Sequence, residues 1–166
     1  MIQKLYDGWR KKLLVGVGLD TDPNKIPKHL RKKTRNKFNA TLEFNKAIVD
    51  ATKDIVLAYK INIAFYEKYG PAGIIIFNKT VDYIKETAPC VFLILDVKRG
   101  DIGNTNEGYT TYLEMADSIT INGYFGEIAN EPFLVEKFKD KIIFVLAQTS
   151  NKGTKIQNLM AEGMPV

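Results

Sequence analysis

Residues 91–105 read VFLILDVKRGDIGNT, an apolar, β-branched run that passes directly into charged and glycine-containing sequence. The apolar part, residues 91–97, has the length and composition of a buried β-strand. Similar short runs occur at residues 13–19, 55–61, 118–121 and 142–147. We therefore predict five buried strands, of which this one is the third.

The segments between these strands carry helical patterns. Residues 38–53 and 73–86 both place their apolar side chains near one face at a spacing of 3.6 residues. We expect further helices over residues 105–115 and 130–138. Strands that alternate with helices indicate βαβ units, and hence an α/β fold with a parallel sheet.

Polar side chains follow the predicted strands on their C-terminal side, where a core strand alone would not need them. They are Asp20, Lys60, Asp96, Lys98, Asn122, Thr149 and Ser150. Because the C-terminal ends of parallel strands meet at one edge or one barrel mouth, we expect these residues to come together in an active site.

Asp96, Lys98 and Asp101 form the densest part of this set. The two-residue period of a strand turns Asp96 and Lys98 to one face, and a turn at Gly100 allows Asp101 to stand nearby. With Lys60 the site would hold two lysines and two aspartates. Such alternation keeps a lysine protonated as a proton donor. A purely structural ion-pair network is the alternative interpretation.

Other chemistries find little support in the sequence. Cys90 and His29 are the single cysteine and histidine, and no P-loop, GxGxxG, GxSxG or HExxH motif is present. Lys98 would compete with a metal ion for the oxygens of Asp96, which favours an ion pair. Asp20 and Asp22 could be metal ligands, but an Asp-Pro turn with one polar substrate contact is the simpler interpretation.

Charge and composition bear on partners and location. The net charge is +5, with basic residues concentrated in residues 25–37. We interpret that run as a solvated loop or helix face rather than a nucleic-acid-binding arm, because no aromatic platform accompanies it. The sequence shows no leader at Met1 and no apolar run of about 18 residues. We expect a cytoplasmic protein that binds neither nucleic acid nor membrane.

Several segments resemble the orotidine 5′-phosphate decarboxylase family, in its longer-chain bacterial and archaeal branch. They are VGLDTDP (17–23), EFNKAIVDAT (43–52), AYKINIAFYE (58–67), DVKRGDIGNT (96–105), TINGYFG (120–126) and VLAQTSN (145–151). The Asp-x-Lys-x-x-Asp-Ile pattern of residues 96–102 is the most specific of these, and the resemblance extends over essentially the whole chain.

The resemblance implies roles for individual residues. Lys98 is similar to the lysine that protonates C6 of the pyrimidine, and Asp96 to the aspartate that faces the departing carboxylate. Asp101 resembles an aspartate that reaches into the neighbouring subunit's site and completes a charged array with Lys60. The implied substrate contacts are Asp20 and Lys60 at the ribose, Thr105 from across the dimer interface, and Ser150 at the pyrimidine.

The resemblance also implies an architecture and an activity. The family fold is a TIM (β/α)₈ barrel, so residues 1–166 would be the N-terminal part of one barrel domain, with about the first five β/α units. We expect cofactor-free, metal-free conversion of orotidine monophosphate to UMP by a homodimer. We expect residues 1–166 alone to be inactive, because late barrel loops grip the substrate phosphate. The alternatives are a magnesium-dependent sugar-phosphate decarboxylase or aldolase barrel, and a non-catalytic half-barrel that only binds.

Overall fold

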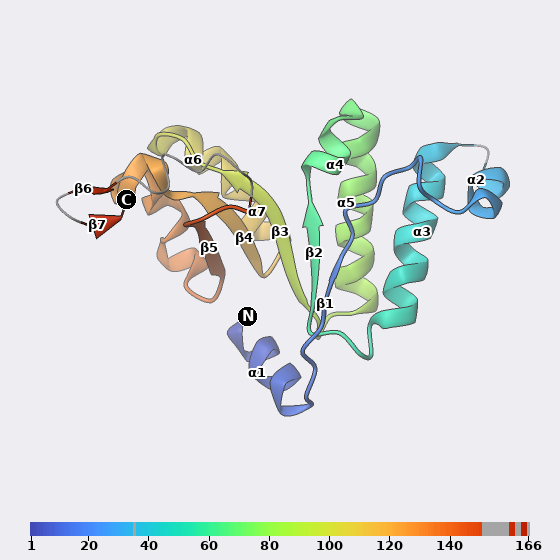
Figure 1. Ribbon diagram of the computed structural model, residues 1–166. Coiled ribbons are helices and arrows are strands. Elements are labelled where there is room, and N and C mark those ends of the chain that lie inside the picture. The colour runs from blue at the N-terminus through green and yellow to red at the C-terminus, as the bar shows by residue number, and fades with distance from the viewer. Residues whose placement is uncertain (35, 151–159, 162–163, 166) are drawn as a thin grey trace.

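A computed structural model of the protein describes residues 1–34, 36–150, 160–161 and 164–165. Five parallel strands form one sheet in which each strand lies beside the next in the sequence (Figure 1). They are β1 (Gly16–Gly18), β2 (Ala58–Asn62), β3 (Phe92–Arg99), β4 (Ser118–Asn122) and β5 (Ile142–Leu146). The prediction of an α/β fold with five parallel strands is confirmed, and the arrangement is that of the first five β/α units of a TIM barrel.

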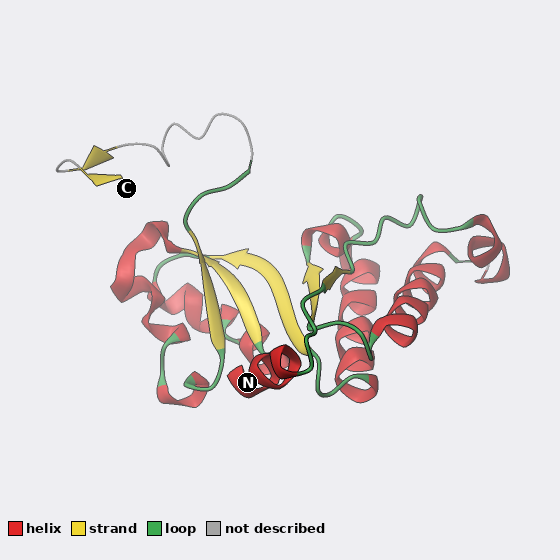
Figure 2. Cartoon of the chain, turned by 60° about the horizontal axis from the view of Figure 1, so that its bottom comes forward, coloured by secondary structure: helices red, strands yellow, loops and turns green. Residues whose placement is uncertain are grey.

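Helices alternate with these strands, as Figure 2 shows in red and yellow. The α-helices are α1 (Ile2–Arg10), α2 (Lys28–Thr34), α3 (Lys37–Thr52), α4 (Ala64–Glu67), α5 (Gly70–Thr87), α6 (Gly103–Tyr109), α7 (Thr111–Met115) and α8 (Gly126–Asn130). Three 3₁₀ turns follow β4, namely η1 (Gly123–Phe125), η2 (Glu131–Phe133) and η3 (Glu136–Phe138). A separate antiparallel pair consists of β6 (Met160–Ala161) and β7 (Met164–Pro165).

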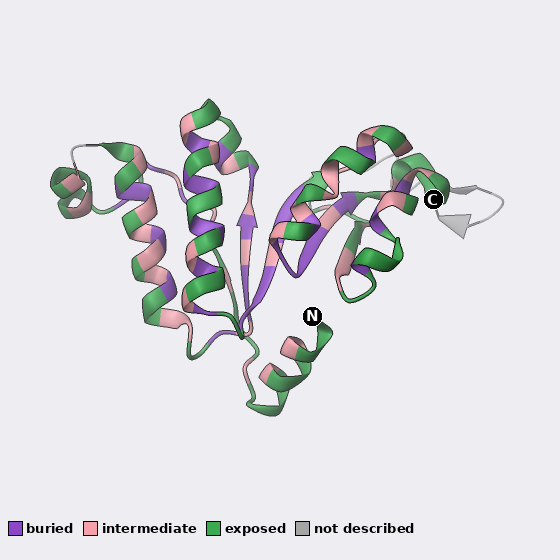
Figure 3. Cartoon of the chain, turned by 180° about the vertical axis from the view of Figure 1, so that it is seen from behind, coloured by how far each residue is buried: buried purple, intermediate pink, exposed green. Residues whose placement is uncertain are grey.

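The core lies between the sheet and the helices that pack on it. α3 and α5 lie side by side, and both turn their buried faces toward the strands (Figure 3). Val49 of α3 and Phe77 of α5 are almost fully buried with Ile61 of β2 and Leu95 of β3. Burial of these side chains fixes the strands firmly, so that the residues following each strand occupy defined positions.

Two predicted helices differ from the structure. Residues 130–138 were expected to form one helix, but they form the turns η2 and η3. Val135 has an extended backbone (φ −68°, ψ 157°), so no helix can run through the segment, although Pro132 in the first turn would be compatible with one. The helix expected over residues 105–115 is two short helices that meet at Thr110, whose side chain bonds back to the carbonyl of Glu107.

The first strand is shorter than predicted. Residues 13–19 were expected, but β1 contains only Gly16–Gly18, and Leu14 and Val15 are exposed. Two glycines in three residues leave few side chains to pack against a neighbouring strand, which limits the length of the strand. β2 likewise begins at Ala58 rather than at residue 55, because Ile55 and Val56 still bond to the carbonyl of Thr52 at the end of α3.

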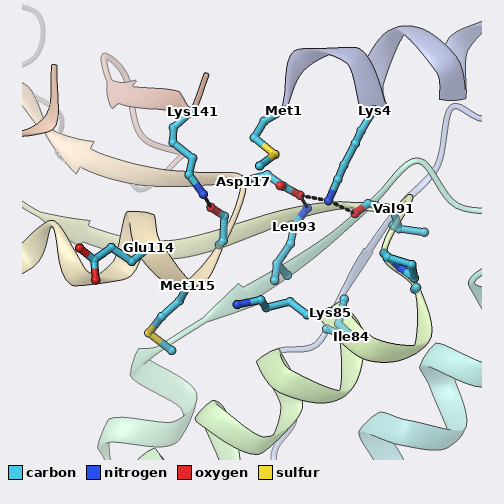
Figure 4. A pocket seen from close by; sticks show the side chains of 13 residues that line it. Met1, Lys4, Ile84, Lys85, Val91, Leu93, Glu114, Met115, Asp117 and Lys141 are labelled. Atoms are coloured by element: carbon cyan, nitrogen blue, oxygen red, sulfur yellow. Dashed lines mark hydrogen bonds and ion pairs between the residues drawn. The ribbon is translucent and has the colours of Figure 1, made fainter. Parts of the chain in front are cut away.

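The N-terminal helix α1, which the sequence did not predict, lies at the N-terminal ends of the strands. The ammonium of Lys4 lies 2.8 Å from a carboxylate oxygen of Asp117, which precedes β4, and it also approaches the carbonyl of Val91 (Figure 4). The same carboxylate oxygen accepts the amide of Leu93 at 2.9 Å. These contacts border a hollow of about 340 Å³ that Lys85 and Lys141 also line. They fasten α1 to the end of the sheet opposite the polar strand ends.

The basic run is solvated, as the sequence predicted. α2 has no buried residue, and its basic side chains are exposed in the described part of the run. In the part of the chain that the structure describes, no helix is both long enough and apolar enough to span a membrane.

Candidate active site

Three neighbouring strands bring four charged side chains together at their C-terminal ends. Asp20 follows β1, Lys60 lies in β2, and Asp96 and Lys98 lie in β3. The ammonium of Lys60 lies 2.8 Å from Asp20 and 3.6 Å from Asp96, and the ammonium of Lys98 lies 2.5 Å from Asp96. The order of charges is thus negative, positive, negative, positive. Of the residues predicted to form the site, these four are brought together.

Asp96 is the best buried of the four, with 9% of its side chain exposed. Burial alone would raise the pKa of this carboxyl, but hydrogen bonds from Lys98 and Thr120 and the charges of Lys98 and Lys60 outweigh it. The net pKa lies below the ordinary value of 3.8. Asp96 is therefore ionised at neutral pH and holds both lysine ammonium groups beside it.

The two lysines are more accessible than Asp96. The side chain of Lys60 is 38% exposed and that of Lys98 is 46% exposed. Each ammonium can therefore contact both a carboxylate of the protein and a molecule bound at the strand ends. Both lysines therefore present positive charge at the surface of the site, whereas Asp96 lies beneath them.

The backbone around Lys98 departs from a regular strand. Four residue steps of β3, from Leu95 to Arg99, are matched by two steps of β4, so the register shifts at this point. Lys98 itself has a positive φ of 46°, which is unfavourable for a residue with a side chain. Its amide donates to the hydroxyl of Thr120 in β4 at 2.9 Å. Asp96 and Lys98 are in contact as predicted, but through a bulge rather than through simple alternation.

Gly100 permits the turn that follows. A Cβ atom at this position would lie 2.6 Å from the carbonyl oxygen of Asn122, so no larger residue fits without a shift. The chain leaving β3 therefore passes directly against the end of β4. The side chain of Asn122 accepts the amide of Tyr124 at 3.1 Å and thereby caps η1.

A buried network of hydrogen bonds holds the backbone next to Asp20. Asp20 follows Leu19, whose carbonyl accepts the Tyr66 hydroxyl at 2.7 Å, and precedes Thr21, whose hydroxyl donates to Asn45 at 2.6 Å. Asn45, which is fully buried, donates to Tyr66 and to Thr80. The chain is thus held on both sides of Asp20.

The carboxylate of Asp20 is held by two residues of β2. One of its oxygens accepts the amide of Asn62 at 3.0 Å, in addition to the ammonium of Lys60. Asp22 does not join this group, and its carboxylate accepts the amide of Asn24 at 3.0 Å in the turn that the Asp-Pro sequence suggested. Among the described residues, no three His, Cys, Asp or Glu side chains gather as a potential metal site.

Asp101 and Thr105 lie apart from the charged group within one chain. A carboxylate oxygen of Asp101 accepts the amide of Ile102 at 2.7 Å, and Asn106 bonds to the Asp101 backbone on both its amide and its carbonyl. No ion pair joins Asp101 to Lys60 or Lys98 among the described residues. Thr105 is half-buried in the first turn of α6. The structure fixes both residues firmly but does not bring them into the four-residue group.

Ser150 is exposed in a bend that follows β5, at the end of the described segment 36–150. Its assigned contact with a pyrimidine stays a prediction. Thr120, in contrast, was not singled out from the sequence, although its hydroxyl donates to Asp96 at 2.8 Å. One feature of the sequence could have identified Thr120. It lies two residues before Asn122 in a predicted strand, on the opposite face to Ile119 and Ile121.

Comparison with known proteins gives one consistent result. The model of the "Orotidine 5'-phosphate decarboxylase / HUMPS family" matches residues 15–164. An orotidine 5'-phosphate decarboxylase of Bacteroides fragilis (strain YCH46) is 51% identical over 148 residues, which are 87% of this chain and 52% of that protein. That of Clostridium acetobutylicum is 40% identical over 170 residues, covering 98% of this chain and 58% of the relative. The chain spans about half the length of the curated relatives it matches.

Comparison with solved structures leads to the same family. A putative orotidine-monophosphate-decarboxylase from Toxoplasma gondii has a TM-score of 0.84 and 30% sequence identity, with 98% of this chain and 55% of that chain covered. One from Plasmodium yoelii has the same TM-score of 0.84 at 25% identity, with 98% and 66% covered.

Proposed function

Because this chain belongs to the orotidine 5′-phosphate decarboxylase / HUMPS family, we propose that the complete protein converts orotidine 5′-monophosphate to UMP and carbon dioxide without a cofactor. Two relatives that carry the decarboxylase name are 51% and 40% identical to the chain. The observation that carries the proposal is the alternating group of Asp20, Lys60, Asp96 and Lys98 at the strand ends. Residues 1–166 form the N-terminal part of a single barrel domain.

Lys98 is the group that meets the reacting carbon. When the bond between C6 of the pyrimidine and the carboxylate breaks, carbon dioxide leaves and the electron pair stays on C6. The ammonium of Lys98 stabilises that negative charge more strongly than it stabilises the uncharged ring carbon, and it then gives a proton to C6. Its exposed position suits this role, because the ammonium can reach C6 while it remains paired with the carboxylate of Asp96 at 2.5 Å.

The other residues of the group bind and orient the substrate. Lys60 and Asp20, joined at 2.8 Å, offer a donor and an acceptor to the ribose hydroxyls. Asp96 faces the substrate carboxylate, and Ser150 contacts the pyrimidine. The phosphate is held by residues of the complete protein outside this chain, and binding of that remote group positions the pyrimidine against Lys98. Residues 1–166 alone are therefore inactive.

The protein is a homodimer in which Asp101 and Thr105 serve the partner's site. Both lie apart from the charged group of their own chain, Asp101 just before α6 and Thr105 in its first turn. Large apolar side chains are exposed around them, including Ile102 (58%), Ile128 (80%) and Leu134 (63%). α6 packs beside α8 and η2, and the three border a hollow of about 570 Å³. An exposed apolar surface of this kind suits association with a second copy. We place the dimer in the cytoplasm.

The test is the conversion of orotidine monophosphate to UMP by the complete protein, followed by the fall in absorbance of the substrate with a chelator present. We expect turnover without added metal, and a loss of at least about 1,000-fold on Lys98→Ala, because the proton donor and the stabilising charge both disappear. Lys79→Ala on the exposed face of α5 is the control and should behave like the parent. Activity on a sugar phosphate that needs magnesium, with none on orotidine monophosphate, would replace the proposal.

The dimer is tested by mixing two inactive variants, Lys60→Ala and Asp101→Ala. If Asp101 serves the partner's site, hybrid dimers contain one site with neither substitution, and activity returns. Exchange of subunits is measured separately with two affinity tags. Exchange without recovered activity would assign Asp101 to the site of its own chain.

A further inference from the structure

We infer that Thr120 is a positioning residue, whose hydroxyl sets the orientation of the Asp96 carboxylate and of the Lys98 backbone at the same time. The inference rests on the proposed function and names a residue to which none of the implied roles was given. Thr120 lies in β4, whereas Asp96 and Lys98 both lie in β3. A single side chain of one strand thus joins two functional residues of its neighbour.

The direction of the two hydrogen bonds follows from the donors present. The amide of Lys98 can only donate, so the Thr120 oxygen must accept it at 2.9 Å. The one proton of the hydroxyl is then free for the carboxylate of Asp96, whose Oδ1 it reaches at 2.8 Å. This proton needs an acceptor at Oδ1, so the hydroxyl favours the ionised form of Asp96.

The hydrogen bond also distinguishes the two oxygens of Asp96. Oδ1 receives both the Thr120 hydroxyl and the Lys98 ammonium, the latter at 2.5 Å, whereas Oδ2 faces Lys60 at 3.6 Å. A carboxylate can rotate about its terminal torsion, because that torsion is broad. Thr120 fixes the rotation, and with it the oxygen that lies against Lys98.

The backbone contact is needed because the strand is irregular here. Lys98 has a φ of 46°, and the register of β3 against β4 shifts between Leu95 and Arg99. A residue in this conformation persists only where its surroundings hold it. The hydrogen bond from the Lys98 amide to the Thr120 hydroxyl is one such restraint. It fixes the backbone position from which the Lys98 side chain extends.

The experiment compares Thr120→Val, which keeps the shape but removes the hydroxyl, with Thr120→Ser, which keeps the hydroxyl. Both are made in the complete protein, and Thr111→Val on α7, an exposed threonine, is the control. We expect Thr120→Val to lower kcat by roughly 10-fold to 100-fold with KM changed by less than about 3-fold, since a misplaced reacting group costs turnover rather than binding. Thr120→Ser should recover most of kcat.

A second readout does not depend on turnover. Carbon-detected NMR of the Asp96 carboxyl as a function of pH should give a higher pKa in Thr120→Val than in the parent, and Thr120→Ser should restore the parent value. If Thr120→Val does not fold, Thr120→Ala removes the same hydroxyl with less bulk against the neighbouring side chains.

The outcomes separate the two proposals. A parent protein without decarboxylase activity would overturn the proposed function, and the carboxyl titration would still test Thr120. Equal kcat in the valine and serine variants, or an Asp96 titration unchanged by valine, would overturn the positioning role. A rise in KM with kcat unchanged would do so too, because it would assign Thr120 to substrate binding.

Discussion

Replacing Asn45 by alanine should lower the free energy of unfolding by about 4 kcal/mol. The Asn45 amide is fully buried and makes three hydrogen bonds, accepting from Thr21 at 2.6 Å and donating to Tyr66 at 2.9 Å and to Thr80 at 3.0 Å. Each is worth about 1 kcal/mol net, and the space left by the amide adds roughly 1 kcal/mol. The Thr21 hydroxyl would lose its acceptor, whereas Tyr66 and Thr80 keep the backbone carbonyls to which they donate.

The assay is urea unfolding of the parent and the variant, followed by far-ultraviolet circular dichroism. The matched control is Asn39→Ala, which removes the same amide from the exposed face of the same helix, α3, and should change stability by less than about 0.5 kcal/mol. A loss below about 1 kcal/mol for Asn45→Ala, with an unchanged slope, would show that water replaces the amide. The network would then not be what holds the chain on both sides of Asp20.

Three further outcomes are expected. Lys4→Ala should cost about 1–3 kcal/mol, because it leaves the buried carboxylate of Asp117 without its cation, and faster hydrogen exchange in α1 should accompany it. The stabilisation from ionised Asp96 is present above its ordinary pKa of 3.8 and is lost as the pH falls through its lower folded value, so the stability gap between the parent and Asp96→Asn should narrow on acidification in urea titrations. Burial raises the pKa of Tyr66 to about 12, so subtracting the absorbance titration of Tyr66→Phe from that of the parent should reveal a tyrosine that ionises near 12 rather than 10.0.

The five strands and the charged group could be predicted because their signals are local. Each strand is a short β-branched run, and the residues of the charged group lie at the C-terminal ends of the first three runs. The contacts from Asp20 to Lys60 and from Lys60 to Asp96 then follow from parallel pairing, which aligns strand ends. No detail of side-chain packing was needed for this part of the prediction.

The remaining features depend on contacts between distant segments. The ion pair between Lys4 in α1 and Asp117 joins residues 113 positions apart, and the pattern of neither segment predicts it. The role of Thr120 depends on a register shift that a regular strand pattern does not contain. The helix expected over residues 130–138 was wrong because the backbone is extended at Val135, which divides the segment into η2 and η3.

The order of the strands has a consequence for how the chain folds. Because each of β1 to β5 pairs with the strand that follows it in the sequence, each new β/α unit can add to a sheet that already exists while the chain emerges from the ribosome. Each step joins strands that are much closer in the sequence than Lys4 and Asp117 are, which keeps the entropic cost of each pairing lower. The contact between Lys4 and Asp117 is different, because it can form only after the fourth strand has been delivered. Docking of α1 should therefore be a late event. A fluorescent probe on α1 would report when this helix packs against the N-terminal ends of the strands.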